Sequence, residues 1–146
     1  VCLQNWYCPI KVQYSDSAYY SPSSDHIICP QREQFPQGAE YYGTLLHEMA
    51  HSTGSPQRLN RTFGCFFGDA LYARADLVYE LTAALCCAFF GYAAAPQETN
   101  AAYLQHWLTK RKEEPAFLVE ILGDVNKAAK MIADKVTEPI NEPAAA

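Results

Sequence analysis

The stretch that decides the fold runs from Tyr41 to Gly54 and reads YYGTLLHEMAHSTG. It contains a His-Glu-x-x-His motif formed by His47, Glu48 and His51. On a helix, the two histidines lie one turn apart on one face, with Cβ atoms roughly 5–6 Å apart. Both imidazoles can then reach one zinc ion at about 2.0–2.1 Å. Glu48 would stand beside the metal as the general base for an attacking water, so the motif predicts a zinc-peptidase type of site.

The residues around the motif follow helical spacing. We expect a helix from Ala39 to Thr53, entered after Pro36 and ended by Gly54 in the left-handed conformation. Its expected buried face is apolar and consists of Tyr42, Leu45, Leu46, Met49 and Ala50.

Composition favours one globular domain. The chain has 146 residues, of which 49% are hydrophobic and 18% charged. We expect a single domain over residues 1–137 and a flexible Pro/Ala-rich tail over 138–146. No apolar run approaches the roughly 20 residues of a membrane span, and no signal peptide is visible, so we expect a cytoplasmic protein without membrane contact.

The net charge and the cysteine spacing argue against two further kinds of site: a nucleic-acid surface and a cysteine zinc site. The formal charge of −5 argues against a broad nucleic-acid surface, so DNA is an unexpected partner for this domain. None of the six cysteines has the C-x-x-C spacing of a zinc site. We expect reduced thiols, with Cys86 and Cys87 buried in an apolar helix.

Short alternating segments precede the motif. We expect strands at 11–14, 18–20 and 26–29, joined by tight turns into a small antiparallel three-stranded sheet. His26 begins the last of these strands and is expected to be structural rather than a metal ligand. After the motif, the pattern predicts helices at 71–90, 97–112 and 115–136, with Asp69 capping the first of them and Gly91 ending it. The fold class is therefore α+β.

A catalytic zinc site usually has a third protein ligand. Gln57 stands where the extended motif H-E-x-x-H-x-x-G-x-x-H would have its last histidine, so we look to the helix at 71–90. That helix carries Asp76 and Glu80 on one face. We favour Glu80 as the ligand because it is longer and can cross an interhelical gap of roughly 8–10 Å. Asp76 would then orient a histidine ring, and the reverse assignment stays open.

Donors for a developing oxyanion are harder to choose. The loop at 55–70 would lie beside the site, and it carries Arg58 and Arg61. Tyr41 and Tyr72 are the other candidates. Each of the four residues also has a structural interpretation, in which it packs or pairs without touching a substrate.

With these residues in view, the chain resembles the C-terminal zincin-like metallopeptidase domain of ArdC-type antirestriction proteins. Such domains also occur in polyvalent proteins of phages, plasmids and conjugative elements. The likeness is carried by the lead-in at Ala18–Ile27, the helix at Phe35–Gly54, the basic segment Arg58–Arg61, Tyr72-Ala73 with Asp76–Leu81, and the closing helices at 101–134 with Trp107-Leu108.

The resemblance implies a zincin-like fold, bound Zn²⁺ and hydrolysis of a peptide or protein substrate. It also implies carriage by mobile DNA and protection from a host restriction enzyme. One alternative is a catalytically weak zincin-shaped module that blocks such an enzyme by occupancy alone. Another is a DNA-associated antirestriction domain, which the negative charge disfavours. Two residues depart from the family pattern: Ser52 replaces a bulky aromatic, and Tyr79 replaces a small residue. The family's single-strand DNA-binding domain has no counterpart in these residues, so its activity is not expected here.

Overall fold

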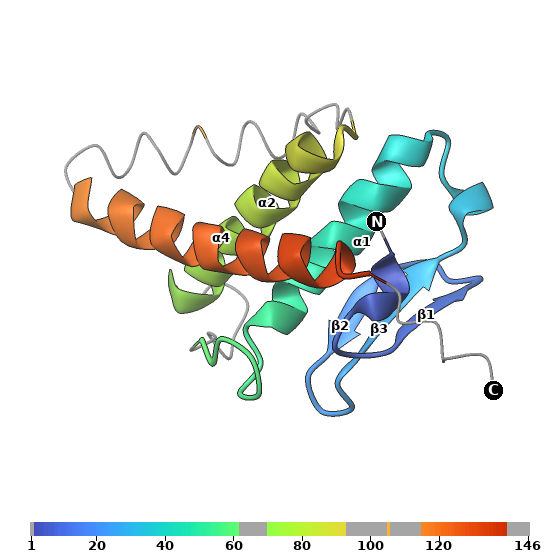
Figure 1. Ribbon diagram of the computed structural model, residues 1–146, viewed down its shortest axis with the longest axis horizontal. Helices are drawn as coiled ribbons and strands as arrows, with labels where there is room; N and C mark the ends of the chain where they lie inside the picture. Colours follow the sequence, from blue (N-terminus) through green and yellow to red (C-terminus); the bar gives the residue numbers. More distant parts are fainter. Residues whose placement is uncertain (1, 62–69, 93–104, 106–114, 140–146) are drawn as a thin grey trace.

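The computed structural model describes residues 2–61, 70–92, 105 and 115–139. A small sheet lies against one helix, and two further helices complete the layers on the side away from the sheet (Figure 1). In chain order the elements are η1 (Leu3–Asn5), β1 (Ile10–Gln13), β2 (Tyr19–Ser21), β3 (His26–Pro30), η2 (Arg32–Gln34), α1 (Gly38–Thr53), α2 (Ala70–Phe90) and α4 (Pro115–Val136). The α+β class is therefore confirmed.

The sheet is mixed, with strand order β1-β3-β2. β2 and β3 form an antiparallel hairpin in which Tyr20 pairs with Ile27. β1 runs parallel to β3 and pairs Ile10 with Ile27. The predicted all-antiparallel sheet is therefore wrong for β1. β3 is the most apolar strand, with Ile27 and Cys29 fully buried, so it takes the centre and leaves the more exposed β1 and β2 at the edges.

The core lies between the sheet and the helices. α1 packs on β2 and β3 on one side and on α2 on the other, and α2 also packs on α4. The largest hydrophobic cluster joins residues from every layer, with Ile27, Leu45, Leu46, Met49 and Ile132 each at most 1% exposed. This arrangement places the motif helix between the sheet and α2.

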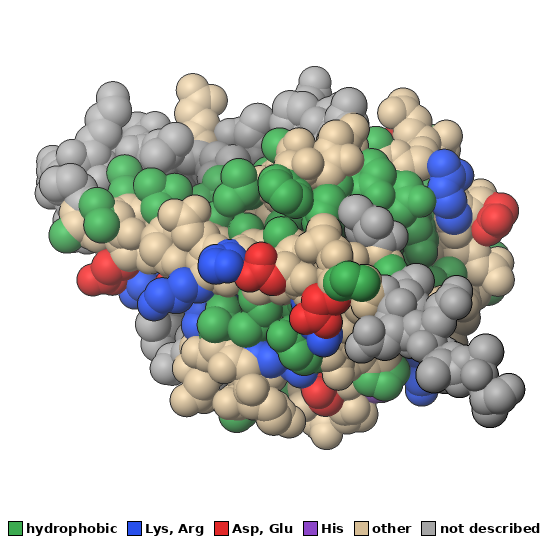
Figure 2. Space-filling view, in the orientation of Figure 1, with side chains coloured by type: hydrophobic (Ala, Val, Ile, Leu, Met, Phe, Trp, Pro, Cys, Tyr) green, Lys and Arg blue, Asp and Glu red, His purple; other side chains and the backbone are tan. Residues whose placement is uncertain are grey.

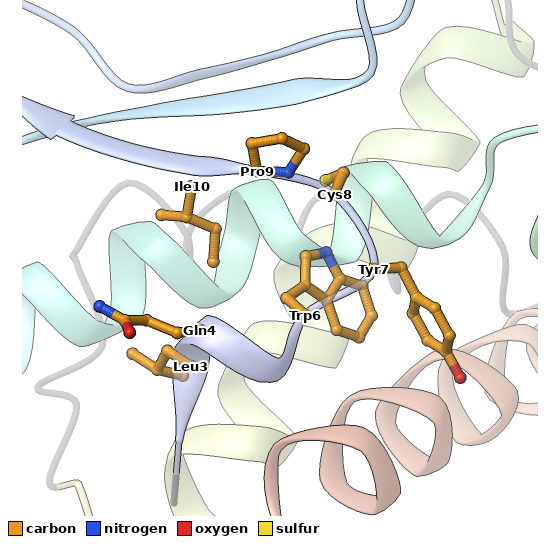
Figure 3. Close-up of a pocket in the computed structure, with 7 residues that line it drawn as sticks. All are labelled: Leu3, Gln4, Trp6, Tyr7, Cys8, Pro9 and Ile10. Carbon is orange, nitrogen blue, oxygen red and sulfur yellow. The ribbon is translucent and has the colours of Figure 1, made fainter. Parts of the chain in front are cut away.

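The N-terminal segment closes one side of this core. Trp6 is buried and its Nε1–H donates to Ser52 Oγ on α1 at 2.9 Å. Tyr7 points toward α4 (Figure 3), where Lys135 Nζ lies 5.0 Å from its ring centre. A hollow of about 400 Å³ is lined by Leu3, Gln4 and residues 6–10 (Figure 3). A small residue is therefore required at Ser52, because the Trp6 indole occupies the space beside it. A bulky aromatic side chain at this position would collide with the indole and could not accept its hydrogen bond.

The end of α1 differs from expectation. Gly54 has φ −81° and ψ −2°, which is right-handed, so the prediction of a left-handed Gly54 is wrong. The chain instead turns through backbone hydrogen bonds, one of which runs from Leu59 N–H to Thr53 O at 2.8 Å. Asn60, with φ 48°, takes the left-handed conformation. The loop after the motif thereby folds back on the helix end.

The later helices agree with expectation where they are described. α2 and α4 have nearly the predicted bounds, and Gly91, with φ 74°, ends α2. The predicted Asp69 cap, the helix at 97–112 and most of the predicted tail lie outside the described residues. Acidic and basic side chains lie near one another on the face shown in Figure 2, and on α4 Lys130 pairs with Asp134. None of the helices in the described ranges is both long and apolar enough to span a membrane.

Candidate metal centre

The two histidines of the motif face each other on α1. Their Nε2 atoms lie 3.1 Å apart. Two nitrogens bound to one tetrahedral zinc at the usual bond length would be about 3.3 Å apart. The side chains therefore already have nearly the separation that a shared metal ion requires, and the i, i+4 spacing on a regular helix is the reason.

A carboxylate from α2 completes a three-residue group. Potential ligand atoms of His47, His51 and Asp76 all lie within 4.8 Å of one another. α1 and α2 run side by side in Figure 1 and make the most extensive interhelical contact. Asp76 is half-buried, and burial raises the pKa of its carboxyl group, with His47 acting in the opposite direction. A divalent cation would relieve that burial cost because it would be a direct counter-charge.

Glu80 lies at the other nitrogen of His47. Its Oε1 atom is 3.0 Å from His47 Nδ1. An acceptor at Nδ1 holds the proton on that nitrogen and leaves Nε2 free to bind a metal. The geometry thus favours the arrangement that sequence reasoning left as its alternative, in which Asp76 faces the histidine pair and Glu80 orients a ring.

The electrostatics of the two histidines differ. Burial lowers the pKa of His47, but the hydrogen bond to Glu80 and nearby carboxylates raise it more, so its net shift is upward. For His51, burial and then the charges of His47 and Arg61 lower the pKa to about 3. His51 is therefore neutral near pH 7 and presents a lone pair, as a metal ligand must.

Glu48 is buried on the sheet side of the same helix turn. Its side chain is only 8% exposed, and burial raises the pKa of its carboxyl group above the usual value. His47 and a hydrogen bond from the Tyr20 backbone act in the opposite direction. A carboxylate with a raised pKa is a better proton acceptor than an exposed one, as a general base requires.

Tyr79 contacts the histidine pair in a way that sequence reasoning missed. Its ring stacks on His51, with centroids 3.9 Å apart and planes 29° apart. The Arg61 guanidinium carbon lies 5.7 Å from the same ring centre. The spacing could have indicated this contact, because Tyr79 follows Asp76 by three residues and so lies on the same face of the helix.

The predicted oxyanion donors have structural contacts. Arg58 Nε donates to Ser52 O at 2.6 Å, and its guanidinium pairs with Asp25. Arg61 donates to Thr53 Oγ1 at 2.6 Å. Tyr41 packs edge-on against Phe35 and Tyr42, while the side chain of Tyr72 is outside the described residues. The oxyanion role stays a prediction for all four. His26 lies apart from the metal group, with Nδ1 2.6 Å from Ser24 Oγ.

Two solved structures resemble most of this chain. The Mn(II)-bound crystal structure of the antirestriction protein ArdC from the R388 plasmid superposes with a TM-score of 0.77 at 31% identity, over 90% of this chain and 49% of that one. Its metal-free form superposes with a TM-score of 0.73 at 32% identity, over 88% of this chain and 46% of that one.

Curated relatives are longer proteins. DNA primase TraC of Escherichia coli is 34% identical over 137 residues, which are 88% of this chain and 13% of that protein. The uncharacterized protein y4eC of Sinorhizobium fredii (strain NBRC 101917 / NGR234) is 37% identical over 91 residues, 62% of this chain and 30% of that protein. Residues 3–121 match the family described as zincin-like metallopeptidase. The chain therefore belongs to the zincin-like metallopeptidase family.

Proposed function

We propose that this chain is a zinc-dependent peptidase domain in which His47, His51 and Asp76 hold the ion. Glu80 orients His47, and Glu48 is the general base. The observation that carries the proposal is the pair of Nε2 atoms 3.1 Å apart, with an Asp76 oxygen in the same group. Two imidazole nitrogens and one carboxylate oxygen match a catalytic zinc site, which leaves one position open for water or substrate.

The choice of metal follows from the donor set. Imidazole nitrogens suit zinc better than they suit magnesium or calcium, and the related ArdC crystal contained Mn(II). When bound, the ion supplies Lewis acidity that polarises the scissile carbonyl and makes water more acidic.

Glu48 then carries the proton. Its buried carboxylate takes a proton from the attacking water and passes it to the leaving amine. Burial raises the pKa of Glu48 and so brings it closer to the working pH, where one group can accept a proton in the first step and return it in the second. The Tyr20 backbone, which donates to Glu48, fixes where the carboxylate points.

The substrate that we propose is a peptide or protein. The likeness to an antirestriction protein supports a protein of the host restriction system as the target, met in the cytoplasm. Because this chain spans about half of ArdC and a smaller share of TraC, that part of the proposal depends on whatever accompanies the domain in longer proteins.

The test compares the wild-type chain with Glu48→Gln. Metal analysis should find one zinc per chain in both proteins, because Glu48 is no ligand. Cleavage of a casein or mixed peptide substrate should fall by about 10²–10⁴-fold in the variant, the usual contribution of a general base. Equal cleavage by both proteins would refute the mechanism. Antirestriction activity that persists in full in Glu48→Gln would instead favour inhibition by occupancy.

A further inference from the structure

The two histidines of the metal group are oriented in different ways. His47 has a hydrogen-bond acceptor, Glu80, at its Nδ1 atom. Within the described part of the chain, no such acceptor lies at Nδ1 of His51. What His51 has instead is an aromatic neighbour: the Tyr79 ring lies at 3.9 Å between centroids and is tilted by 29°.

We propose that Tyr79 is a positioning residue that holds the His51 imidazole plane by stacking, so that its Nε2 atom stays directed at Nε2 of His47. The inference rests on the proposed function, because it takes His51 to be a metal ligand. Tyr79 and Glu80 are successive residues of α2. Two neighbouring residues of α2 therefore orient the two histidines of α1: Tyr79 orients His51 through its ring face, and Glu80 orients His47 through its carboxylate.

The geometry around Tyr79 supports a fixed ring rather than a passing contact. Tyr79 is 2% exposed and belongs to the main core cluster. A second contact joins its ring to His47, edge-on at 6.2 Å. Because the ring touches both imidazoles and cannot swing into solvent, it restricts the rotation of His51 about its side-chain bonds.

Arg61 packs against the Tyr79 ring and helps to hold it in place. Its guanidinium carbon lies 5.7 Å from the Tyr79 ring centre, within the range of a cation–π contact. The guanidinium is itself tied to the end of α1 by donation to Ala50 O at 3.2 Å and Thr53 Oγ1 at 2.6 Å. Tyr79 thus connects the loop after the motif to the histidine pair.

The alternative is that Tyr79 only fills space in the core. The two roles differ in what they predict for metal binding. A space-filling residue affects the stability of the fold and leaves the affinity of the folded protein for metal unchanged. A positioning residue affects that affinity, and losses of contacts to ligand side chains typically weaken metal binding by about 10–100-fold.

The experiment measures the zinc dissociation constant by competition with a chromogenic chelator, using zinc ion alone as the probe. Tyr79→Phe keeps the ring face and Tyr79→Leu removes it. Val78→Ala is the matched control, because Val78 is equally buried on the same helix but packs in a separate cluster. We expect Tyr79→Leu to weaken zinc binding about tenfold or more, and Tyr79→Phe and Val78→Ala to bind as the wild type does.

A second readout is the visible absorption spectrum of the cobalt-loaded protein, which reports ligand geometry. It should change in Tyr79→Leu and not in Tyr79→Phe. Tyr79→Met, which is more flexible and of similar bulk, replaces the leucine variant if the latter does not fold. Wild-type affinity and spectrum in the variant without a ring would overturn the inference, as would equal losses in the phenylalanine and leucine variants. Either result leaves the proposed function standing, whereas a wild-type chain that binds no zinc overturns both.

Discussion

Nδ1 of His47 and Oε1 of Glu80 lie 3.0 Å apart, while Nε2 of the same ring faces His51 at 3.1 Å. Each nitrogen of one imidazole therefore has its own neighbour. A metal shared by the two Nε2 atoms would have Glu80 at the far nitrogen of His47, and Asp76, in the group with both histidines, would be the acid placed to hold the ion.

This relationship predicts different losses for the two acids. Asp76→Asn should weaken zinc binding by more than about 100-fold, because a charged ligand is replaced by a poor one. Glu80→Gln should weaken it by about 10–100-fold, because only the orientation and basicity of His47 are affected. Isothermal titration with zinc measures both. A larger loss in Glu80→Gln than in Asp76→Asn would restore Glu80 as the ligand.

Metal removal should lower stability. Zinc binds the folded site and not the unfolded chain, so at a free concentration 100 times Kd it should add about 2.7 kcal/mol to the free energy of unfolding. Urea unfolding with zinc and with a chelator measures the difference. His51→Ala is the control, since without its second imidazole the protein should unfold alike in both conditions. A wild-type protein indifferent to the chelator would contradict a bound metal.

The arrangement of three residues of the candidate site could be predicted because helical spacing is local. His47, Glu48 and His51 sit within one and a half turns, so a regular helix alone sets their arrangement. Spacing could not decide between Asp76 and Glu80 as the ligand, because both lie on one face of α2. The choice depends on how α2 is shifted and rotated against α1. The stack of Tyr79 on His51 depends on that same packing.

The fold shows the same division between local and long-range information. The bounds of α1, α2 and α4 follow from periodicity and from Gly91. The parallel pairing of β1 with β3 does not follow from periodicity, because strand order depends on which strand is buried on both sides. Gly54 was misassigned for a related reason: the loop returns to α1 through Arg61 N–H to Gly54 O at 3.1 Å, and Asn60 makes the left-handed turn instead.

Two glycines should respond in opposite ways to alanine. Gly123 lies inside α4, and a Cβ there would meet nothing within 4 Å. Gly123→Ala should stabilise the protein by about 0.5–1 kcal/mol through helix propensity. Gly91 has φ 74°, so Gly91→Ala should cost about 1–2 kcal/mol. Thermal unfolding of both variants measures this, and shifts of equal sign would contradict the account.

Asp25 connects the hairpin turn to the end of α1. Its carboxylate pairs with Arg58 and accepts from Tyr20 Oη at 2.7 Å. The hydrogen bond from Arg58 is the main reason that the pKa of Asp25 is lowered, and burial partly opposes it. A carboxyl group whose pKa is lower in the folded than in the unfolded chain stabilises the fold above the unfolded pKa. That stabilisation is lost as pH falls through the folded pKa.

Asp25→Asn should therefore destabilise the protein at pH 7 and much less at acidic pH. Asparagine tolerates the left-handed conformation that Asp25 adopts, with φ 46°, so the backbone contributes little to the change. At pH 7 the loss should be about 1.5 kcal/mol, at the lower end for a hydrogen bond between charged groups, because Asp25 is partly exposed. Urea unfolding of both proteins from pH 7 to pH 3 measures it. Asp134→Asn, at an exposed pair on α4, is the control and should change stability little at any pH. A constant gap between wild type and Asp25→Asn across this range would show that the ion pair with Arg58 does not stabilise the turn.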